Sequence, residues 1–181
     1  MPPSALVQYV DNPALANAYC SLAFATQFDL DRPAGTAAVP VPTWSSATSV
    51  QQTAAILWAT KLMDRLWHWT GYPTDAVQAL LWPRGGILNV NGWVYIDLHT
   101  VPPEIQQATA EYARQLLVSD RTADSEIETQ GVLGLKAGSV SLTFKPSVFA
   151  KQVPDSVYAL VPQMWGYPRS RTSGMRHLMR A

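Results

Sequence analysis

The sequence predicts a mainly α-helical protein, a small bundle of about four to five helices with one or two β-hairpins and a C-terminal arm. Three observations support this prediction. Apolar residues recur at helical spacing in several segments, proline and glycine separate these segments, and two short stretches alternate like paired strands around a turn. No internal repeat is visible, so residues 1–167 are expected to form one helical domain.

Two helices are predicted in the N-terminal part of the chain. Asn12 can cap a helix over about 12–28, whose apolar residues follow one face. Residues 31–46 contain three prolines and are expected to form a loop. From 46 to about 69 there is no glycine or proline, and apolar residues lie on one stripe. This segment predicts the longest helix.

Shorter elements follow the long helix. Thr74 or Asp75 can cap a short helix over about 75–81, which Pro83 stops. The Asn91-Gly92 pair between two β-prone runs is a strong hairpin signal, and it favours either a small β-ribbon or an irregular extended loop.

The C-terminal half predicts two helices and a hairpin. Pro103 and Glu104 suit the first turn of a helix that runs to about Val118. Apolar residues on both sides of 136–139 alternate as in a hairpin. Asp155 can cap a last short helix.

Charge is scarce and unevenly distributed. Charged residues are 14% of the chain, against roughly 25% in average soluble proteins. The seven Trp and seven Tyr suit either a core or the centre of a protein interface. Residues 1–167 hold 9 Lys and Arg against 13 Asp and Glu, a net charge of −4, whereas residues 168–181 hold four Arg and no acid. Part of the surface is therefore expected to contact neighbouring molecules.

The N-terminal segment and the single cysteine suggest neither secretion nor a disulfide. No charged region precedes an apolar core near the N-terminus, and no apolar run is long enough to cross a membrane. Cys20 lies among apolar residues and is expected to be a buried small side chain.

No catalytic or metal-binding pattern is present in the sequence. His68, His99 and His177 lack the spacing of a metal site or a catalytic triad, and one cysteine cannot supply paired zinc ligands. The glycines near Gly134 are not followed by the Gly-Lys-Ser/Thr of a phosphate-binding loop. We therefore expect a protein that is not an enzyme and that has no cofactor and no metal.

The C-terminal arm, residues 168–181, is the most basic segment. Its arginines could bind phosphates or carboxylates, because a guanidinium donates two parallel hydrogen bonds to either. The arm could also be a solvated tail, but Met175, Leu178 and Met179 favour a docking peptide.

Three motifs in this order resemble a known family. They are the helix segment Gln51-Gln52-Thr53-Ala54-Ala55-Ile56-Leu57-Trp58-Ala59-Thr60, the ending Gln78-Ala79-Leu80-Leu81-Trp82-Pro83-Arg84, and the helix start Val101-Pro102-Pro103-Glu104-Ile105-Gln106-Gln107-Ala108-Thr109. The sequence is similar to the bacteriophage head-to-tail adaptor (connector) family, whose members are often labelled DnaT-like single-stranded DNA-binding proteins. The resemblance covers about residues 9–145.

The resemblance implies a structural virion protein of the phage neck. Such an adaptor assembles in the host cytoplasm into a ring, commonly dodecameric, that links the portal protein to tail, nozzle or terminator proteins. Genomic DNA passes through the ring without sequence-specific binding, and no membrane is involved. The alternative is a single-stranded DNA-binding protein of the DnaT-like type, which would need a basic groove with interleaved aromatic side chains.

Two kinds of partner site are predicted on this basis. We expect the arm to bind the portal, with arginines pairing acidic groups and apolar residues filling pockets; the residues concerned are Arg169, Arg171, Arg176, Leu178, Met179 and Arg180. Arg84 follows the helix-ending motif and could pair with an acidic neighbour inside the subunit or across a subunit interface. The acidic body is expected to line a channel that repels DNA phosphate.

Overall fold

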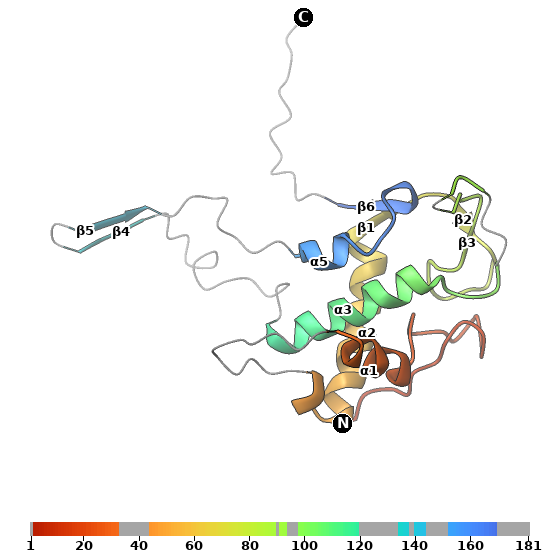
Figure 1. Ribbon diagram of the computed structural model, residues 1–181, viewed down its shortest axis with the longest axis horizontal. Helices are drawn as coiled ribbons and strands as arrows, with labels where there is room; N and C mark the ends of the chain where they lie inside the picture. The colour runs from red at the N-terminus through yellow and green to blue at the C-terminus, as the bar shows by residue number, and fades with distance from the viewer. Residues whose placement is uncertain are drawn as a thin grey trace, which may run out of the picture.

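The computed structural model describes residues 2–32, 44–89, 91–93, 98–119 and 152–169, together with the backbone of 134–137 and 140–143. Four α-helices and six short strands are assigned among these residues. Helices α2 and α3 cross at the centre, α1 lies at one end of this pair, and α5 packs on α3 (Figure 1). The predicted mainly helical class is confirmed.

Helix α1 spans Leu22–Leu30 and begins later than the predicted residue 12. Asn12 does cap a turn, because its side chain accepts from the backbone N–H groups of Ala14 and Leu15. The chain then becomes irregular, since the Asn17 side chain binds the backbone of Ala5 and Val7. A side chain that hydrogen-bonds to a distant backbone competes with helix formation.

Helix α2, Ser49–Leu66, is the longest helix, as predicted. Thr48 and Gln51 form a capping box at its start. The helix ends three residues before the predicted Trp69, because Trp67–Trp69 extends as strand β1 and pairs antiparallel with β6, Gly166–Pro168. The backbone hydrogen bonds between β1 and β6 therefore end the helix, although the apolar stripe of α2 continues to Trp69.

The helix predicted over 75–81 is absent. Residues 74–83 form a turn that the Gln78 side chain holds: its Oε1 accepts from the Asp75 N–H at 2.9 Å, and its Nε2 donates to Leu80 O at 2.6 Å and Pro83 O at 3.2 Å. Strands β2, Tyr72–Pro73, and β3, Arg84–Gly85, pair across the base of this turn. The Trp82–Pro83 peptide bond is cis.

The remaining elements largely follow the predictions. Helix α3 spans Pro103–Val118 with Pro at its first turn, and α5 spans Asp155–Tyr158 with Pro154, rather than Asp155, as its N-cap. Strands β4, Gly134–Ala137, and β5, Val140–Thr143, form the predicted antiparallel hairpin. Short 3-10 turns cover Trp44–Ser46 and Gln163–Trp165.

The hairpin predicted around Asn91-Gly92 is confirmed only as a turn. Asn89 donates its N–H to Trp93 O, and its side chain accepts from Asn91 N and Trp93 N. Gly92 has a φ of 84°, which favours glycine. Val90 and residues 94–97 of the predicted strands lie outside the described residues.

Tryptophans provide much of the core. Trp44, Trp67, Trp82 and Trp165 are buried, and Trp69 stacks on Trp67 at 5.0 Å and packs edge-on against Trp82 at 5.4 Å. Trp58 and Trp93 are exposed instead. Within the described part of the chain, no helix is long and apolar enough to cross a membrane.

Candidate functional site

Arg84 is buried within the chain and makes its contacts to backbone oxygens. Its Nε donates to Thr70 O at 2.7 Å, and its terminal nitrogens donate to Gly71 O at 2.7 Å and Leu81 O at 3.1 Å. Only 7% of the residue is exposed. The hydrogen-bond partners of its guanidinium are therefore three carbonyl oxygens, and the predicted pairing of Arg84 with an acidic neighbour, inside the subunit or across an interface, stays a prediction.

A buried acid lies near Arg84. The Tyr19 hydroxyl donates to Asp64 Oδ1. Burial raises the pKa of Asp64 to about 6, although the hydrogen bond from Tyr19 and the charge of Arg84 oppose this shift. Burial also lowers the pKa of Arg84. We call Tyr19, Asp64 and Arg84, with the carbonyls that Arg84 binds, the polar knot; it joins the N-terminal segment, α2 and the 81–84 motif.

Glu111 forms ion pairs with two more arginines. Arg32 and Arg114 form ion pairs with its carboxylate, the second at 2.9 Å, and Gln115 donates to it at 3.0 Å. Burial raises the pKa of Glu111, but these hydrogen bonds outweigh burial and leave the pKa below its usual value. The ion pair of Arg32 therefore links the end of α1 to α3, whereas the ion pair of Arg114 lies within α3.

Among the side chains that the structure describes, three further cations lie near the C-terminal end of α2. Lys61 and Arg65 lie one turn apart on one exposed face of α2. Arg169 follows β6, where its N–H binds Leu66 O and its Nε donates to Trp67 O at 3.3 Å. Among the described residues, no carboxylate forms an ion pair with any of them.

Exposed aromatic rings lie beside these cations. Trp58 is 43% exposed and precedes Lys61 by three residues on the same helix face. His68 and Tyr167 face each other across the β1–β6 pair, with ring centroids 5.3 Å apart. We call this set the α2 strip; its members are Trp58, Lys61, Arg65, His68, Tyr167 and Arg169. Cations interleaved with open aromatic faces can contact both the phosphates and the bases of a single strand.

The strip was missed in the sequence, although part of its signal was present. Lys61 and Arg65 are exposed at i, i+4 spacing and follow an off-stripe Trp58. The interleaved Asp64 hides this pattern, because only the structure shows its carboxylate turned inward to Tyr19. The nearness of Arg169 also depends on the pairing of β6 with β1.

The C-terminal arm is described only at its start. Pro168 lies in β6 and Arg169 is bonded to the end of α2, so these two residues belong to the folded body rather than to a separate arm. The other predicted arm contacts, Arg171, Arg176, Leu178, Met179 and Arg180, lie outside the described residues.

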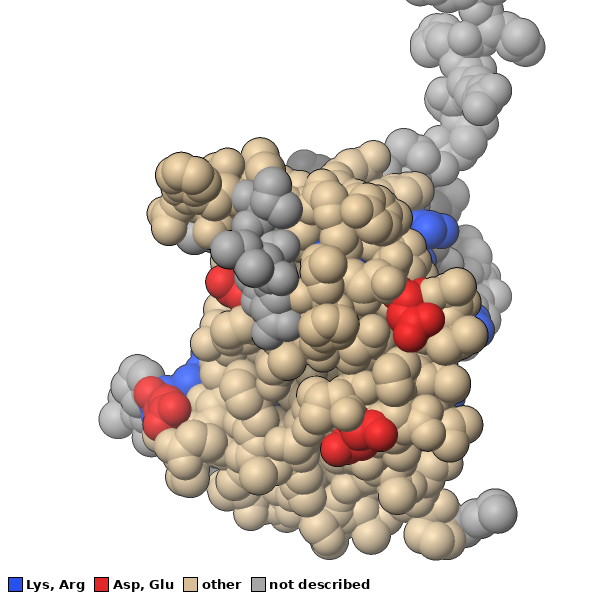
Figure 2. Space-filling view, turned by 90° about the vertical axis from the view of Figure 1, so that its right-hand side faces the viewer, with Lys and Arg blue, Asp and Glu red and all other residues tan. Residues whose placement is uncertain are grey.

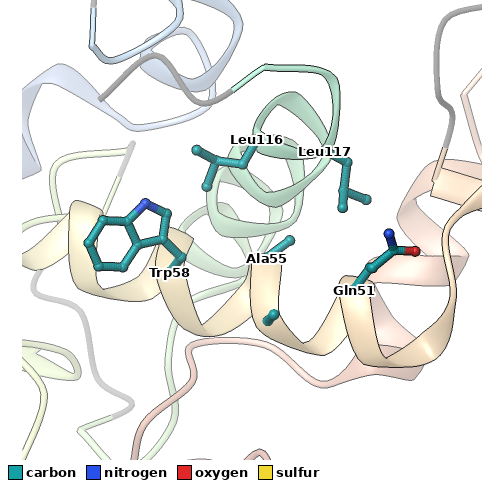
Figure 3. Close-up of a pocket in the computed structure, with 6 residues that line it drawn as sticks. Gln51, Ala55, Trp58, Leu116 and Leu117 are labelled. Carbon is teal, nitrogen blue, oxygen red and sulfur yellow. The ribbon is translucent and has the colours of Figure 1, made fainter. Parts of the chain in front are cut away.

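An apolar groove continues the strip toward the N-terminus of α2. It lies between α2 and α3, encloses about 250 Å³, and is lined by Gln51, Ala54, Ala55, Trp58, Leu116 and Leu117. Trp58 and Gln51 stand at its two ends, and Leu116 and Leu117 lie across from Ala55 (Figure 3). We call this the α2–α3 groove.

A second apolar surface lies at the loop end, which comprises residues 8–15, 71–79, 84–89 and 91–93. Hydrogen bonds join these loops, including Ala79 N to Pro13 O at 2.9 Å. The exposed apolar side chains here are Val10, Leu15, Tyr72, Val77, Leu88 and Trp93. The face of the molecule that includes this end carries few charges (Figure 2).

The described residues hold no candidate metal cluster. His68 is exposed and packs against Tyr167, whereas His177 lies outside the described residues. Cys20 is buried as predicted, and burial raises the pKa of its thiol to about 12, which keeps it protonated and unreactive at neutral pH.

Comparison with known proteins identifies one family. The model of the family described as "Putative DnaT-like ssDNA binding protein" matches residues 7–181. No curated protein and no solved structure matches the chain.

Proposed function

The chain belongs to the family of DnaT-like ssDNA binding proteins, and on this premise we propose that it binds single-stranded DNA through the α2 strip. The observation that carries the proposal is the grouping of Lys61, Arg65 and Arg169 beside exposed aromatic rings. Elsewhere in the described residues, Arg32 and Arg114 form ion pairs with Glu111, and the buried Arg84 donates to three backbone carbonyls.

The chemistry of the strip suits a single strand better than a duplex. The ammonium of Lys61 and the guanidinium of Arg65 lie one turn apart on α2, where both can bind phosphates of one strand. Trp58 has an exposed ring on which a base can stack. A base inside a duplex is already stacked between its neighbours, so stacking on Trp58 favours a single strand. Binding is therefore expected to be sequence-tolerant.

Further cations follow the strip in the sequence. After Arg169, residues 170–181 contain three more arginines and no Asp or Glu. Because Arg169 is bonded to the end of α2, this basic segment starts at the strip. It would extend the contact with the phosphate backbone, and it would raise affinity without adding base specificity.

Fluorescence anisotropy with a labelled oligo-dT strand tests the proposal. The double variant Lys61→Gln/Arg65→Gln should weaken binding at least tenfold at low salt. It should also lower the slope of log affinity against log salt by about 1.4, since each phosphate contact to a single strand contributes about 0.7.

A matched control separates local contacts from net charge. Ala14→Glu/Ala23→Glu also lowers the net charge by two, but on exposed positions outside α2. This variant should retain most of the affinity. Equal losses in both variants, or no measurable binding by the unchanged protein, would overturn the proposal.

We also propose a second candidate, a ring-forming subunit of the phage neck that joins portal and tail and lets DNA pass. The observation that favours it is the presence of two separate apolar surfaces of unlike charge. The described charges at the loop end, apart from the buried Arg84, are Asp11 and Asp75, whereas the α2–α3 groove adjoins Lys61 and Arg65. A head-to-tail contact between unlike surfaces is the type that closes into rings.

Multi-angle light scattering and negative-stain imaging of the purified protein distinguish the two candidates. A neck subunit should form a closed ring of fixed mass that binds purified portal, and Trp93→Glu should prevent ring formation by placing a charge on the loop end. Deletion of residues 170–181 should abolish portal attachment. A monomer at high concentration that ignores portal would sink the second candidate and leave the first untouched.

A further inference from the structure

The α2–α3 groove has the size and shape of a peptide-binding site rather than a small-molecule site. Its volume is about 250 Å³, below the roughly 300–1,000 Å³ of typical ligand pockets. Two helices form its walls, and Ala55 forms a low floor that lets a backbone approach closely (Figure 3).

Exposed apolar side chains extend the groove along α2. Val50 is 53% exposed and stands one turn before Ala54, and Trp58 follows one turn later. Apolar positions spaced by one turn match the i, i+4 spacing of an amphipathic helix that lies in a groove.

Among the described residues, the exposed charges that follow the groove along α2 are of one sign. No residue that lines it is charged, and Lys61 and Arg65 follow Trp58 by one and two turns on the same face. Because α2 rises 1.5 Å per residue, these cations lie about 5 to 10 Å beyond the groove along the helix axis. A helix bound in the groove would therefore contact apolar side chains along its length, and one of its ends would lie near Lys61 and Arg65.

We propose that the α2–α3 groove binds an amphipathic helix of a partner protein, with apolar side chains in the groove and carboxylates at one end that pair with Lys61 and Arg65. Other occupants fit less well. The chain's own C-terminal segment carries only positive charge, so it would meet like charge at the same end. The loop end of a second copy is acidic and apolar but consists of turns rather than a helix.

Two synthetic helical peptides test this proposal on the full-length protein in the absence of DNA. Both carry leucines at i, i+4 and i+7; one has glutamates at one end, and the other has lysines there. Anisotropy of the labelled peptides should show about tenfold tighter binding of the glutamate peptide. Lys61→Glu/Arg65→Glu should reverse this preference.

A groove variant and a matched control complete the experiment. Ala54→Glu places a charge in the groove at an exposed position, and it should reduce binding of the glutamate peptide at least tenfold. Ala23→Glu adds the same charge on α1 and should leave binding unchanged. Circular dichroism checks that both variants remain folded.

Three results would overturn the proposal. They are equal affinity for the two peptides, unchanged binding by Ala54→Glu, and an effect of Ala54→Glu on self-association alone, which would assign the groove to a second copy of the chain. The glutamate peptide should also compete with oligo-dT, because both would use Lys61 and Arg65. Since peptide binding is measured without DNA, failure of the α2 strip to bind DNA is a separate outcome.

Discussion

Arg84 in the polar knot and Arg65 in the α2 strip are the same kind of residue in opposite circumstances. Arg84 is 7% exposed and donates to three carbonyls, whereas Arg65 is exposed and has no ion-pair partner among the described residues. A guanidinium whose donors are used inside the chain stabilises the fold, and one that stays exposed can bind a ligand. The conspicuous motif is therefore structural, and the inconspicuous helix face is the candidate site.

Replacement of Arg84 should have the largest effect on stability. Arg84→Met leaves the carbonyls of Thr70, Gly71 and Leu81 without their donor, and a buried unsatisfied group costs about 1–3 kcal/mol. We expect the free energy of unfolding, measured with urea, to fall by about 3 kcal/mol. Arg65→Met is the control and should change it by less than about 0.5 kcal/mol. Similar losses in both variants would remove the distinction between the two regions.

Asp64 should make the stability of the polar knot depend on pH. Its pKa is raised from 3.8 to about 6 by burial, so the folded state holds a proton that the unfolded state releases. The resulting stabilisation is complete below pH 3.8 and is lost as pH rises through 6. Unfolding free energy should therefore increase as pH falls from 7 to 5, by up to about 1.4 kcal/mol per pH unit.

Asp64→Asn isolates this contribution and should flatten the curve between pH 5 and 7. Glu111 does not interfere, because its lowered pKa confines its opposite effect to pH values below its usual 4.5. A wild-type curve that falls between pH 7 and 5, or an Asp64→Asn curve parallel to it, would contradict the assignment.

Trp58 should matter for DNA binding and little for stability. Loss of one stacked base costs about 1 kcal/mol or more, so Trp58→Ala should weaken oligo-dT binding about fivefold or more. Trp93→Ala removes another exposed tryptophan, 73% exposed, from the loop end and serves as the control. If Trp93→Ala weakens binding as much as Trp58→Ala, the DNA contact does not lie on the strip.

The smallest expected effect concerns Arg65 alone. Arg65→Gln removes one phosphate contact, and it should reduce the salt slope of oligo-dT binding by about 0.7 without a change in unfolding free energy. An unchanged slope would assign the phosphate contacts to other residues.

Local sequence patterns determined most of the helical elements. The uninterrupted apolar stripe before Gly71 predicted α2, and Pro103 with Glu104 predicted the start of α3. These features act through hydrogen bonds and side-chain packing within a few residues, so they can be read without the fold. The hairpin of β4 and β5 was predicted for the same reason.

Only the tertiary structure decided where long-range contacts replace the local structure that the sequence pattern predicts. Trp67–Trp69 leaves the helix to pair with Gly166–Pro168, and Gln78 closes a turn where a helix was predicted. The site depends on the same long-range contacts, because Asp64 turns inward to Tyr19 and because Arg169 is bonded to the end of α2, near Arg65. The chain by itself determined which residues could form helices and carry charge; the tertiary structure decided which charges are satisfied inside the protein, because each buried group needs a partner that the linear order does not reveal.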